Sequence, residues 1–331
     1  MDLWHVNETS PAEYGARVAE AAGHLSAGRL VVIPTETVYG LAADATNGEA
    51  VARIYEAKGR PRFNPLISHV AGPAMAHDHG LLDETASLLA DRFWPGPLTL
   101  VVPKRPGSVI CDLATAGLDT VALRWPDSPV TRAIIETLGR PIAAPSANRS
   151  GRVSPTTAEA AIEEIGASVA MVVDAGPCRI GLESTIVACT GAGRGSRPTL
   201  LRPGGVPTEQ IETVLGQRLA RPRADRSKPM APGMLESHYA PNARVRLDAA
   251  AVSPEEALLA FGPRLPSGAD RAKAVLNLSE RADPVEAAAN LFGYLRRLDA
   301  SGAATIAVAP VPETGLGEAI NDRLRRAAAE R

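Results

Sequence analysis

The sequence contains few aromatic residues and few cysteines. Phe, Trp and Tyr account for only 4% of its 331 residues, so the core must be built mainly from Ala, Val, Leu and Ile. Its three cysteines, Cys111, Cys178 and Cys189, are odd in number and widely spaced. This spacing excludes a disulfide framework and a paired-cysteine metal site, and it favours a reducing compartment. We therefore expect a cytoplasmic protein.

An excess of charge of one sign is also lacking, and so are long hydrophobic runs. The formal net charge is -2, and residues 1–205 carry 18 Lys+Arg against 21 Asp+Glu, so neither half is a polybasic module for nucleic acid. The sequence contains no run of about 18 apolar residues, the length that a membrane-spanning helix needs. The first residues show no basic segment followed by an apolar one, so we expect no secretory signal.

Strand-type apolar runs alternate with amphipathic segments along the first 205 residues, which predicts an α/β domain with a mixed sheet. The expected helices cover 12–25, 49–57, 81–93, 129–138 and about 157–165. The expected strands cover 30–33, 66–70, 98–102, 120–124, 142–144, 170–174, 184–189 and 198–202, the last two forming a hairpin.

The composition changes between about 221 and 241, where the chain is polar, rich in proline and locally basic. Beyond this segment the alternation resumes, with expected strands at 257–261, 274–278 and 305–311 and expected helices at 284–298 and 317–329. We therefore expect a first domain at 1–207, a linker at 208–244 and a small second α/β domain at 245–331.

Three stretches of the first domain carry hydroxyl, basic and amide groups directly after a strand or a helix. They are Pro34–Leu41, Lys58–Leu66 and Ala144–Gly151. Such groups at the carboxyl ends of strands face the crevice where α/β sheets bind ligands, and Arg and Lys can hold phosphate. Each stretch also has a plain structural explanation, because cations, Ser, Thr and Asn are common at helix ends and turns. Together they predict a site for an anionic, phosphate-bearing ligand.

Other motifs for nucleotides and metals are weak or missing. The sequence has no GxxxxGK[ST] loop, and the glycines of Gly191–Gly195 are expected to form a hairpin turn, since no helix follows them. We interpret His77–His79 as a solvated loop before a helix at Leu81, although these residues could also bind a metal. No Ser/His/Asp arrangement is evident.

The three polar stretches resemble the signature of the YrdC/Sua5 family. The matching residues are Thr35–Leu41, Lys58 and Arg60 followed by Asn64–Leu66, and Ser146 with Asn148. The resemblance continues through Ala231–Pro241 and Leu316–Arg323, as in the two-domain Sua5 type, although the family commonly has Ser at the position of Ala231. It implies a YrdC-like mixed twisted sheet with helices, followed by a small Rossmann-like α/β domain.

The resemblance implies a nucleotidyltransferase activity, that of a threonylcarbamoyl-AMP synthase. Such enzymes condense L-threonine, bicarbonate-derived CO2 and ATP to threonylcarbamoyl-AMP and pyrophosphate, for N6-threonylcarbamoyladenosine formation in tRNAs that read ANN codons. It also implies Mg2+ held mainly through the ATP phosphates, no protein metal site, no tightly bound organic cofactor and a linker covering the active site. We expect delivery of the product to the tRNA threonylcarbamoyltransferase machinery, with weak or no direct tRNA binding and no membrane association.

The family's functional residues can be carried over to matching positions. Lys58 and Arg60 are the expected catalytic residues, because the reaction requires positioned cations around phosphate and no protein nucleophile. The further expected ATP-binding residues are Asn64, Thr120, Ser146, Asn148, Ser154, Arg202 and Tyr239. The expected threonine-binding residues are Thr37, His69, Ala144, Ser184 and Arg124, which would pair with the threonine carboxylate.

Two alternative functions remain open. The first is a non-catalytic module that binds double-stranded RNA or the ribosome, which would require a positive groove and salt-dependent affinity. The near-neutral charge of both halves counts against it. The second is carbamoyl transfer, as in larger relatives that add zinc-finger cysteines and an acylphosphatase segment, neither of which occurs in this sequence.

Overall fold

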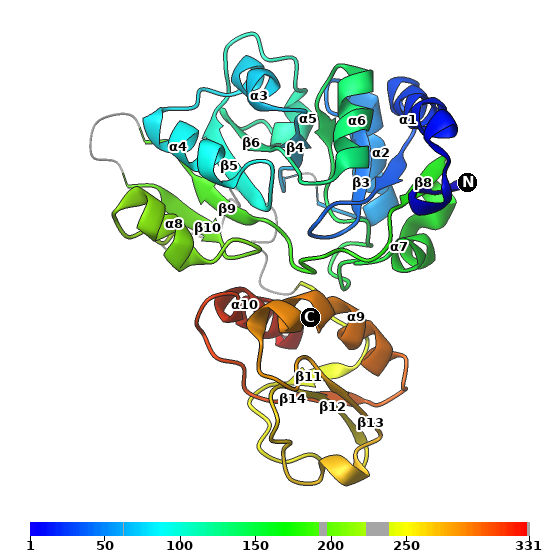
Figure 1. The fold of residues 1–331 in the computed structure, drawn as a ribbon, viewed down its shortest axis with the longest axis vertical. Helices are drawn as coiled ribbons and strands as arrows, with labels where there is room; N and C mark the ends of the chain where they lie inside the picture. The colour runs from blue at the N-terminus through cyan, green and yellow to red at the C-terminus, as the bar shows by residue number, and fades with distance from the viewer. Residues whose placement is uncertain (62, 192–196, 223–237, 330–331) are drawn as a thin grey trace.

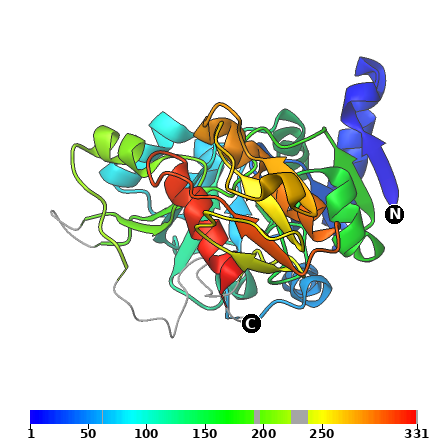
Figure 2. The ribbon, with the colours of Figure 1, turned by 90° about the horizontal axis from the view of Figure 1, so that it is seen from below.

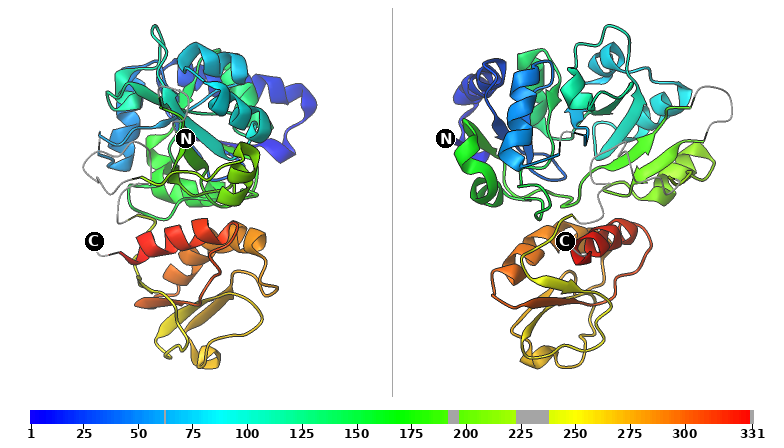
Figure 3. Two further views of the ribbon diagram at one scale, coloured as in Figure 1. Left: turned by 90° about the vertical axis from the view of Figure 1, so that its left-hand side faces the viewer. Right: turned by 180° about the vertical axis from the view of Figure 1, so that it is seen from behind.

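The computed structural model describes residues 1–61, 63–191, 197–222 and 238–329. These residues form a ten-stranded sheet followed by a four-stranded sheet. Figures 1 and 3 show the C-terminal domain below the first domain, with its two helices between its own sheet and the first domain. Figure 2 shows the same domain from below, with the last helix (red) lying across the first domain. Among the described residues, no helix combines the length and apolar character that crossing a bilayer requires.

The large sheet is mixed, and its order is β1-β8-β2-β3-β7-β4-β6-β5-β9-β10. Its strands are β1 (Asp2–His5), β2 (Val31–Ile33), β3 (Gly40–Asp44), β4 (Ile67–His69), β5 (Leu98–Pro103), β6 (Thr120–Arg124), β7 (Ile142–Ala143), β8 (Met171–Asp174), β9 (Thr185–Ala188) and β10 (Thr199–Arg202). The neighbours β4 and β6 run parallel, as do β5 and β9, whereas β5 and β6 run antiparallel. The predicted α/β class with a mixed sheet is therefore confirmed.

Helices cover both faces of this sheet. They are α1 (Pro11–Ser26), α2 (Gly48–Lys58), α3 (Pro73–His79), α4 (Glu84–Phe93), α5 (Asp112–Thr115), α6 (Pro129–Leu138), α7 (Ala158–Ile165) and α8 (Thr208–Leu215). Alternate residues of a strand point to opposite faces, and in β2 Val32 joins one hydrophobic cluster while Val31 and Ile33 join the other. The first cluster includes residues of α2, α4, α5, α7 and α8, and the second includes residues of α1 and α6.

One local prediction was wrong. His77 and His79 do not lie in a solvated loop, because they form the last turn of α3, and His79 is buried. The next helix, α4, begins at Glu84 and not at Leu81. The reason is local, because Pro73 occupies the first turn of α3 and Asp83 caps α4 by accepting a hydrogen bond from the backbone N–H of Ala86.

The C-terminal domain is a four-stranded parallel sheet with order β11-β14-β12-β13, as expected for a small α/β domain. Its elements are β11 (Arg244–Arg246), β12 (Glu256–Ala260), β13 (Ala274–Asn277), α9 (Pro284–Asp299), β14 (Thr305–Val308) and α10 (Gly317–Ala328). Its hydrophobic cluster includes Val38, Val153 and Leu182 of the first domain, which join Leu291 and Phe292 of α9. The two domains therefore share a continuous apolar interface.

The segment proposed as a linker, 208–244, begins with α8. Ile211 of this helix belongs to the hydrophobic core of the first domain, and Ala220 forms a bridge with Thr199 at the start of β10. Residues 223–237, including Ala231, lie outside the described part of the chain. The chain is described again from His238, which with Tyr239 is buried against the first domain.

Candidate active site

A small cavity, partly open to solvent, lies where several strand ends of the first domain meet the residues that precede the C-terminal domain. It is lined by Thr37, Val38, Arg60, Ile67, His69, Arg124, Ala144, Pro145, Ser146, Glu183, Ser184, Arg202, His238 and Tyr239. Three of these residues are arginines and one is a glutamate. The cavity is therefore positively charged overall and suited to anionic ligands.

The end of α2 places Lys58 and Arg60. This helix stops at Lys58 because Gly59 adopts a left-handed conformation (φ 59°), which is typical of a helix C-terminus. Lys58 is buried, and its ammonium group donates hydrogen bonds to the carbonyl oxygens of Ser146 and Asn148. Arg60 is buried in the cavity wall, where its Nη2 donates to the carbonyl oxygen of Pro65 at 3.0 Å. The turn thus brings one cation to a neighbouring loop and the other to the cavity.

Burial changes the ionisation of both cations. The pKa of Lys58 is lowered well below its ordinary value, mainly by burial and further by the neighbouring Arg60. Burial also lowers the pKa of Arg60, to about 10. Arg60 therefore remains charged at neutral pH. An anionic ligand in this cavity would favour the charged forms of both groups, because opposite charges stabilise each other at short range.

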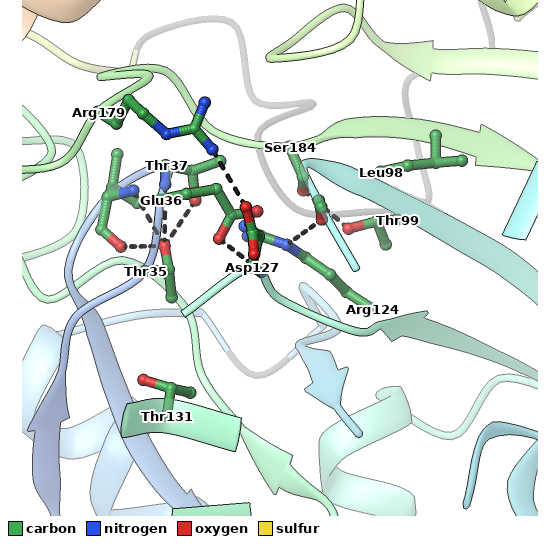
Figure 4. Close-up of polar contacts among 12 residues, drawn as sticks. Thr35, Glu36, Thr37, Leu98, Thr99, Arg124, Asp127, Thr131, Arg179 and Ser184 are labelled. Carbon is green, nitrogen blue, oxygen red and sulfur yellow. Dashed lines mark hydrogen bonds and ion pairs between the residues drawn. The ribbon is translucent and has the colours of Figure 1, made fainter. Parts of the chain in front are cut away.

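Arg124 is held in the cavity wall by a buried ion pair. Its Nη2 lies 2.6 Å from Oε1 of Glu36, and both side chains are almost fully buried, with 4% and 2% exposed. The other carboxylate oxygen of Glu36 accepts a hydrogen bond from the backbone N–H of Asp127 at 3.0 Å. Figure 4 shows this arrangement beside Thr37, whose hydroxyl lies 2.7 Å from that of Thr35. The pairing fixes the guanidinium at the end of β6.

His69 lies beside Arg124 because β4 and β6 pair in parallel register, with His69 opposite Arg124. Its side chain is buried and lines the cavity. Burial lowers the pKa of His69 well below 6.5, and the Arg124 charge lowers it further. The imidazole is therefore neutral at physiological pH and can act as a hydrogen-bond partner without adding charge.

Ser184 directly precedes β9 and Arg202 ends β10, at the other side of the cavity. The hydroxyl of Ser184 lies 2.7 Å from that of Thr99 in β5 (Figure 4), and Nη2 of Arg202 donates to the Ser184 carbonyl oxygen at 2.8 Å. A register shift between Leu200 and Arg202 interrupts the pairing of β10 with β9. Such a bulge re-aims a side chain, here that of Arg202, which lines the cavity.

Glu183 connects the cavity wall to the C-terminal domain. Its Oε1 accepts a hydrogen bond from Ser154 at 2.6 Å, and its Oε2 lies 2.8 Å from Nε of Arg323 in α10. Burial alone would raise the pKa of Glu183, but Arg323 and Arg202 lower it to about 2. Glu183 is therefore an anion across the physiological pH range.

His238 and Tyr239 close the cavity on the side of the C-terminal domain. The Tyr239 ring stacks on Phe292 of α9, with ring centres 5.6 Å apart, and lies under the guanidinium of Arg323. His238 contacts Tyr239 edge-on, and burial lowers its pKa to about 3, so the imidazole is neutral. This wall is therefore aromatic and uncharged.

The structure brings most of the expected site residues to one cavity. Those that line it are Thr37, Arg60, His69, Arg124, Ala144, Ser146, Ser184, Arg202 and Tyr239. Four others are buried close behind the wall or beside it, namely Lys58, Asn64, Asn148 and Ser154. Thr120 begins β6, whereas Arg124 ends it, so the two lie about 13 Å apart along an extended strand. The structure does not bring Thr120 to this cavity.

No role was predicted from the sequence for Glu36, Glu183, His238 or Arg323. Glu183 and His238 directly precede two residues that were predicted to belong to the site, Ser184 and Tyr239. Arg323 had a recognisable signal, because it lies on the same helical face as the apolar residues Ile320 and Ala327. A charge within an apolar stripe indicates a buried partner. That partner, 140 residues away, could not be identified from the pattern.

Comparisons with known proteins agree along the whole chain. A family model for Sua5, YciO and YrdC proteins, described as telomere recombination, matches residues 24–204. A second model, described as the C-terminal domain of threonylcarbamoyl-AMP synthase, matches residues 206–329. The chain is 41% identical to the threonylcarbamoyl-AMP synthase of Bacillus subtilis, over 99% of this chain and 98% of that protein. It is 42% identical to the enzyme of the same name from Pyrococcus abyssi, over 95% of both chains.

Solved structures support the same relationship. The crystal structure of Pyrococcus abyssi Sua5 complexed with L-threonine superposes with a TM-score of 0.87 at 38% sequence identity. The match covers 99% of this chain and 98% of that one, so both domains and their arrangement are shared.

Proposed function

Because the chain belongs to the two-domain Sua5-type threonylcarbamoyl-AMP synthase family, we propose that it condenses L-threonine, CO2 from bicarbonate and ATP to threonylcarbamoyl-AMP and pyrophosphate. The product serves N6-threonylcarbamoyladenosine formation in tRNA. The observation that carries the proposal is the cluster of Arg60, Arg124 and Arg202 around one cavity, which can hold the threonine carboxylate and the ATP phosphates together.

The threonine subsite is assigned to the wall made by β4, β6 and the loop before β3. Arg124 uses Nη2 for Glu36 and Nε for the Gly96 carbonyl oxygen, so its orientation is fixed before any substrate binds. A guanidinium held in this way can pair with the threonine carboxylate. Thr37, His69 and Ser184 surround the same space, and their neutral polar groups suit the amine and the hydroxyl of threonine.

The nucleotide subsite is assigned to Arg60, Ser146, Asn148, Ser154 and Arg202, with Tyr239 covering it. The Oδ1 atom of Asn148 is buried and meets no hydrogen-bond donor among the described residues. An acceptor in that state suits a ribose hydroxyl. Lys58 acts on this subsite by fixing the Ser146–Asn148 loop, and by adding positive charge close to the phosphates.

The reaction needs positioning and charge stabilisation from the protein. The neutral amine of threonine adds to CO2 and loses a proton to solvent, which gives a carbamate. A carbamate oxygen then attacks the α-phosphorus of ATP. The new bond joins this oxygen to phosphorus, and the bond to the leaving pyrophosphate breaks. Arg60 and Arg202, which both line the cavity, would stabilise the charge that develops on the phosphoryl oxygens.

Mg2+ is proposed to arrive with ATP, as part of the substrate. Glu183, the carboxylate in the cavity wall, is paired with Arg323 and accepts from Ser154, and Glu36 behind the wall is paired with Arg124. The described residues contain no cluster of three or more His, Cys, Asp or Glu side chains that could hold a metal ion. The metal is therefore expected to bind mainly to phosphate oxygens. The product is proposed to pass to a tRNA threonylcarbamoyltransferase.

Pyrophosphate release provides the test. The purified full-length protein is incubated with Mg2+-ATP, L-threonine and bicarbonate, and then with threonine or bicarbonate omitted in turn. We expect release that depends on both, together with an adenylate product detectable by mass spectrometry. Release that is independent of threonine and bicarbonate, or no release at all, would contradict the proposal. Salt-dependent binding of double-stranded RNA without any ATP turnover would support the RNA-binding alternative.

A further inference from the structure

A charged side chain of the C-terminal domain reaches the wall of the cavity in the first domain. Arg323 of α10 is completely buried, with 0% of its surface exposed. Removing a guanidinium from water costs free energy unless its donors are paired. The partners of Arg323 therefore indicate which groups it holds in place.

Each nitrogen of the Arg323 guanidinium has a partner. Nε lies 2.8 Å from Oε2 of Glu183, Nη2 donates to the carbonyl oxygen of Pro203 at 3.0 Å, and Nη1 lies 2.6 Å from Oδ2 of Asp322. The centre of the guanidinium lies 5.1 Å from the centre of the Tyr239 ring, which is within cation–π distance. One side chain thus contacts three separate segments outside α10.

These three segments all belong to the cavity or adjoin it. Glu183 lines it, Pro203 directly follows Arg202, and Tyr239 lines it from the segment that precedes the C-terminal domain. Glu183 in turn accepts a hydrogen bond from Ser154, which is one of the expected nucleotide-binding residues. The Arg323 guanidinium therefore fixes the wall of the nucleotide subsite, whereas Arg124 and His69 of the threonine subsite are held by β6 and β4.

The two domains also adhere through contacts that do not involve this charge. Leu291 and Phe292 of α9 already pack against apolar residues of the first domain, and Arg296 pairs with Glu164 at 3.1 Å on another part of the interface. A buried ion pair is often no more stabilising than apolar residues of similar size. The buried guanidinium of Arg323 bonds to the cavity wall, and its role is better explained by the positions in which it holds Glu183 and Pro203.

We propose that Arg323 is a positioning residue for the adenylation site, through which docking of the C-terminal domain aligns the wall that receives the nucleotide. This inference rests on the proposed function and adds a role for the C-terminal domain. Because linkage is reciprocal, binding of the nucleotide also strengthens docking of the domain.

The full-length Arg323→Lys protein tests the proposal. Lysine keeps the charge but cannot bond to Glu183 and Pro203 with a planar fork. We expect kcat/KM for ATP to fall at least about tenfold, a loss of one to two charged hydrogen bonds, with the KM for threonine within about twofold of wild type. Arg325→Lys is the matched control on the same helix, because Arg325 is exposed and pairs with the exposed Glu313. It should keep wild-type kinetics.

Two results would overturn the proposal. One is a lower melting temperature for Arg323→Lys with unchanged kcat and unchanged KM for both substrates, which would make Arg323 purely structural. The other is an equal fold-loss in kcat/KM for threonine and for ATP. If Arg323→Lys does not fold, Glu183→Gln examines the same contact from the first domain, and unaltered ATP kinetics in that variant would equally reject it. Absence of pyrophosphate release in the wild type would instead contradict the proposed function.

Discussion

At the scale of single residues, the site is defined by buried cations whose orientation is fixed by the protein. Arg124 is held by Glu36 and by the Gly96 carbonyl oxygen, and Arg202 is held by the Ser184 carbonyl oxygen. Fixed charges stabilise a ligand or a transition state without paying for reorganisation when it forms. The same burial makes each cation costly to leave unpaired, so each substitution should affect both binding and folding.

Replacement of Arg124 should affect threonine more than ATP. Arg124→Lys keeps a positive charge near Glu36 but loses the planar fork that can hold Glu36 and a carboxylate together. We expect the KM for threonine to rise about tenfold or more, because a hydrogen bond to a charged group contributes about 1.5–3 kcal/mol. Steady-state pyrophosphate release at varied threonine concentration measures this KM. Arg179→Lys is the control, since Arg179 is 70% exposed, pairs with Asp127 nearby and should leave the KM unchanged.

Replacement of Arg60 should affect the chemical step. Arg60→Ala removes a buried guanidinium from the side of the cavity where we propose that the phosphates bind. Loss of such a group from a preorganised site costs about 3 kcal/mol, or about 100-fold in kcat/KM. Arg92→Ala, at an exposed position on α4, should behave as wild type. Wild-type turnover in folded Arg60→Ala would remove Arg60 from the mechanism.

At the scale of elements, the site depends on strand pairing that a sequence only partly reveals. The runs at 98–102 and 120–124 were predicted as strands because their apolar, β-branched residues are bounded by Pro and polar residues, and both are confirmed as β5 and β6. β3 was missed because Gly40–Asp44 contains small residues without β-branching, and α8 was missed within the presumed linker.

The polar stretches of the site were predictable because each lies close to its element in the chain, as Lys58 and Arg60 do at the end of α2. The Glu183–Arg323 pair was not, because it joins residues 140 positions apart through packing of two domains. Periodicity identifies the face of a helix, but it does not identify the element against which that face packs.

The contact of the loop at Gly181 with α9 allows a test of domain docking. Gly181 has φ 72°, and a Cβ atom there would lie 2.5 Å from the carbonyl oxygen of Ala288. Gly181→Ala should therefore push α9 away and lower kcat/KM. This loss of activity comes in addition to a loss of about 1 kcal/mol in stability, which is the cost of an alanine in a left-handed conformation. Gly139→Ala is the matched control, because Gly139 has φ 69° and its Cβ would meet no atom within 4 Å.

The comparison of the two glycine variants separates strain from docking. Both should lose a similar amount of stability from backbone strain, as measured by urea unfolding. Only Gly181→Ala should also lose activity and become more sensitive to proteolysis between the domains. Equal activity of the two variants would show that close contact between this loop and α9 is not needed for catalysis.

At the scale of the whole molecule, burial of neutral histidines makes stability depend on pH. The pKa of His238 is lowered to about 3 by burial, and that of His69 is lowered well below 6.5 by burial and Arg124. The unfolded chain binds a proton at each position near pH 6.5, whereas the folded chain does not. Their contribution to stability is therefore complete above pH 6.5 and is lost as the pH falls toward the folded-state pKa.

This linkage predicts that the wild-type protein loses stability between pH 7 and pH 5, before its carboxylates titrate. Each of the two histidines should lower the free energy of unfolding by about 1.4 kcal/mol per pH unit below about pH 6.5, or about 2 kcal/mol at pH 5. The carboxylate of Glu183, with a pKa of about 2, adds its own loss only below its unfolded value near 4.5. Urea unfolding at several pH values measures the slope. His238→Gln should reduce the slope of unfolding free energy against pH by the contribution of one proton. An unchanged slope would mean that His238 is already protonated in the folded protein, in conflict with the uncharged wall beside Tyr239.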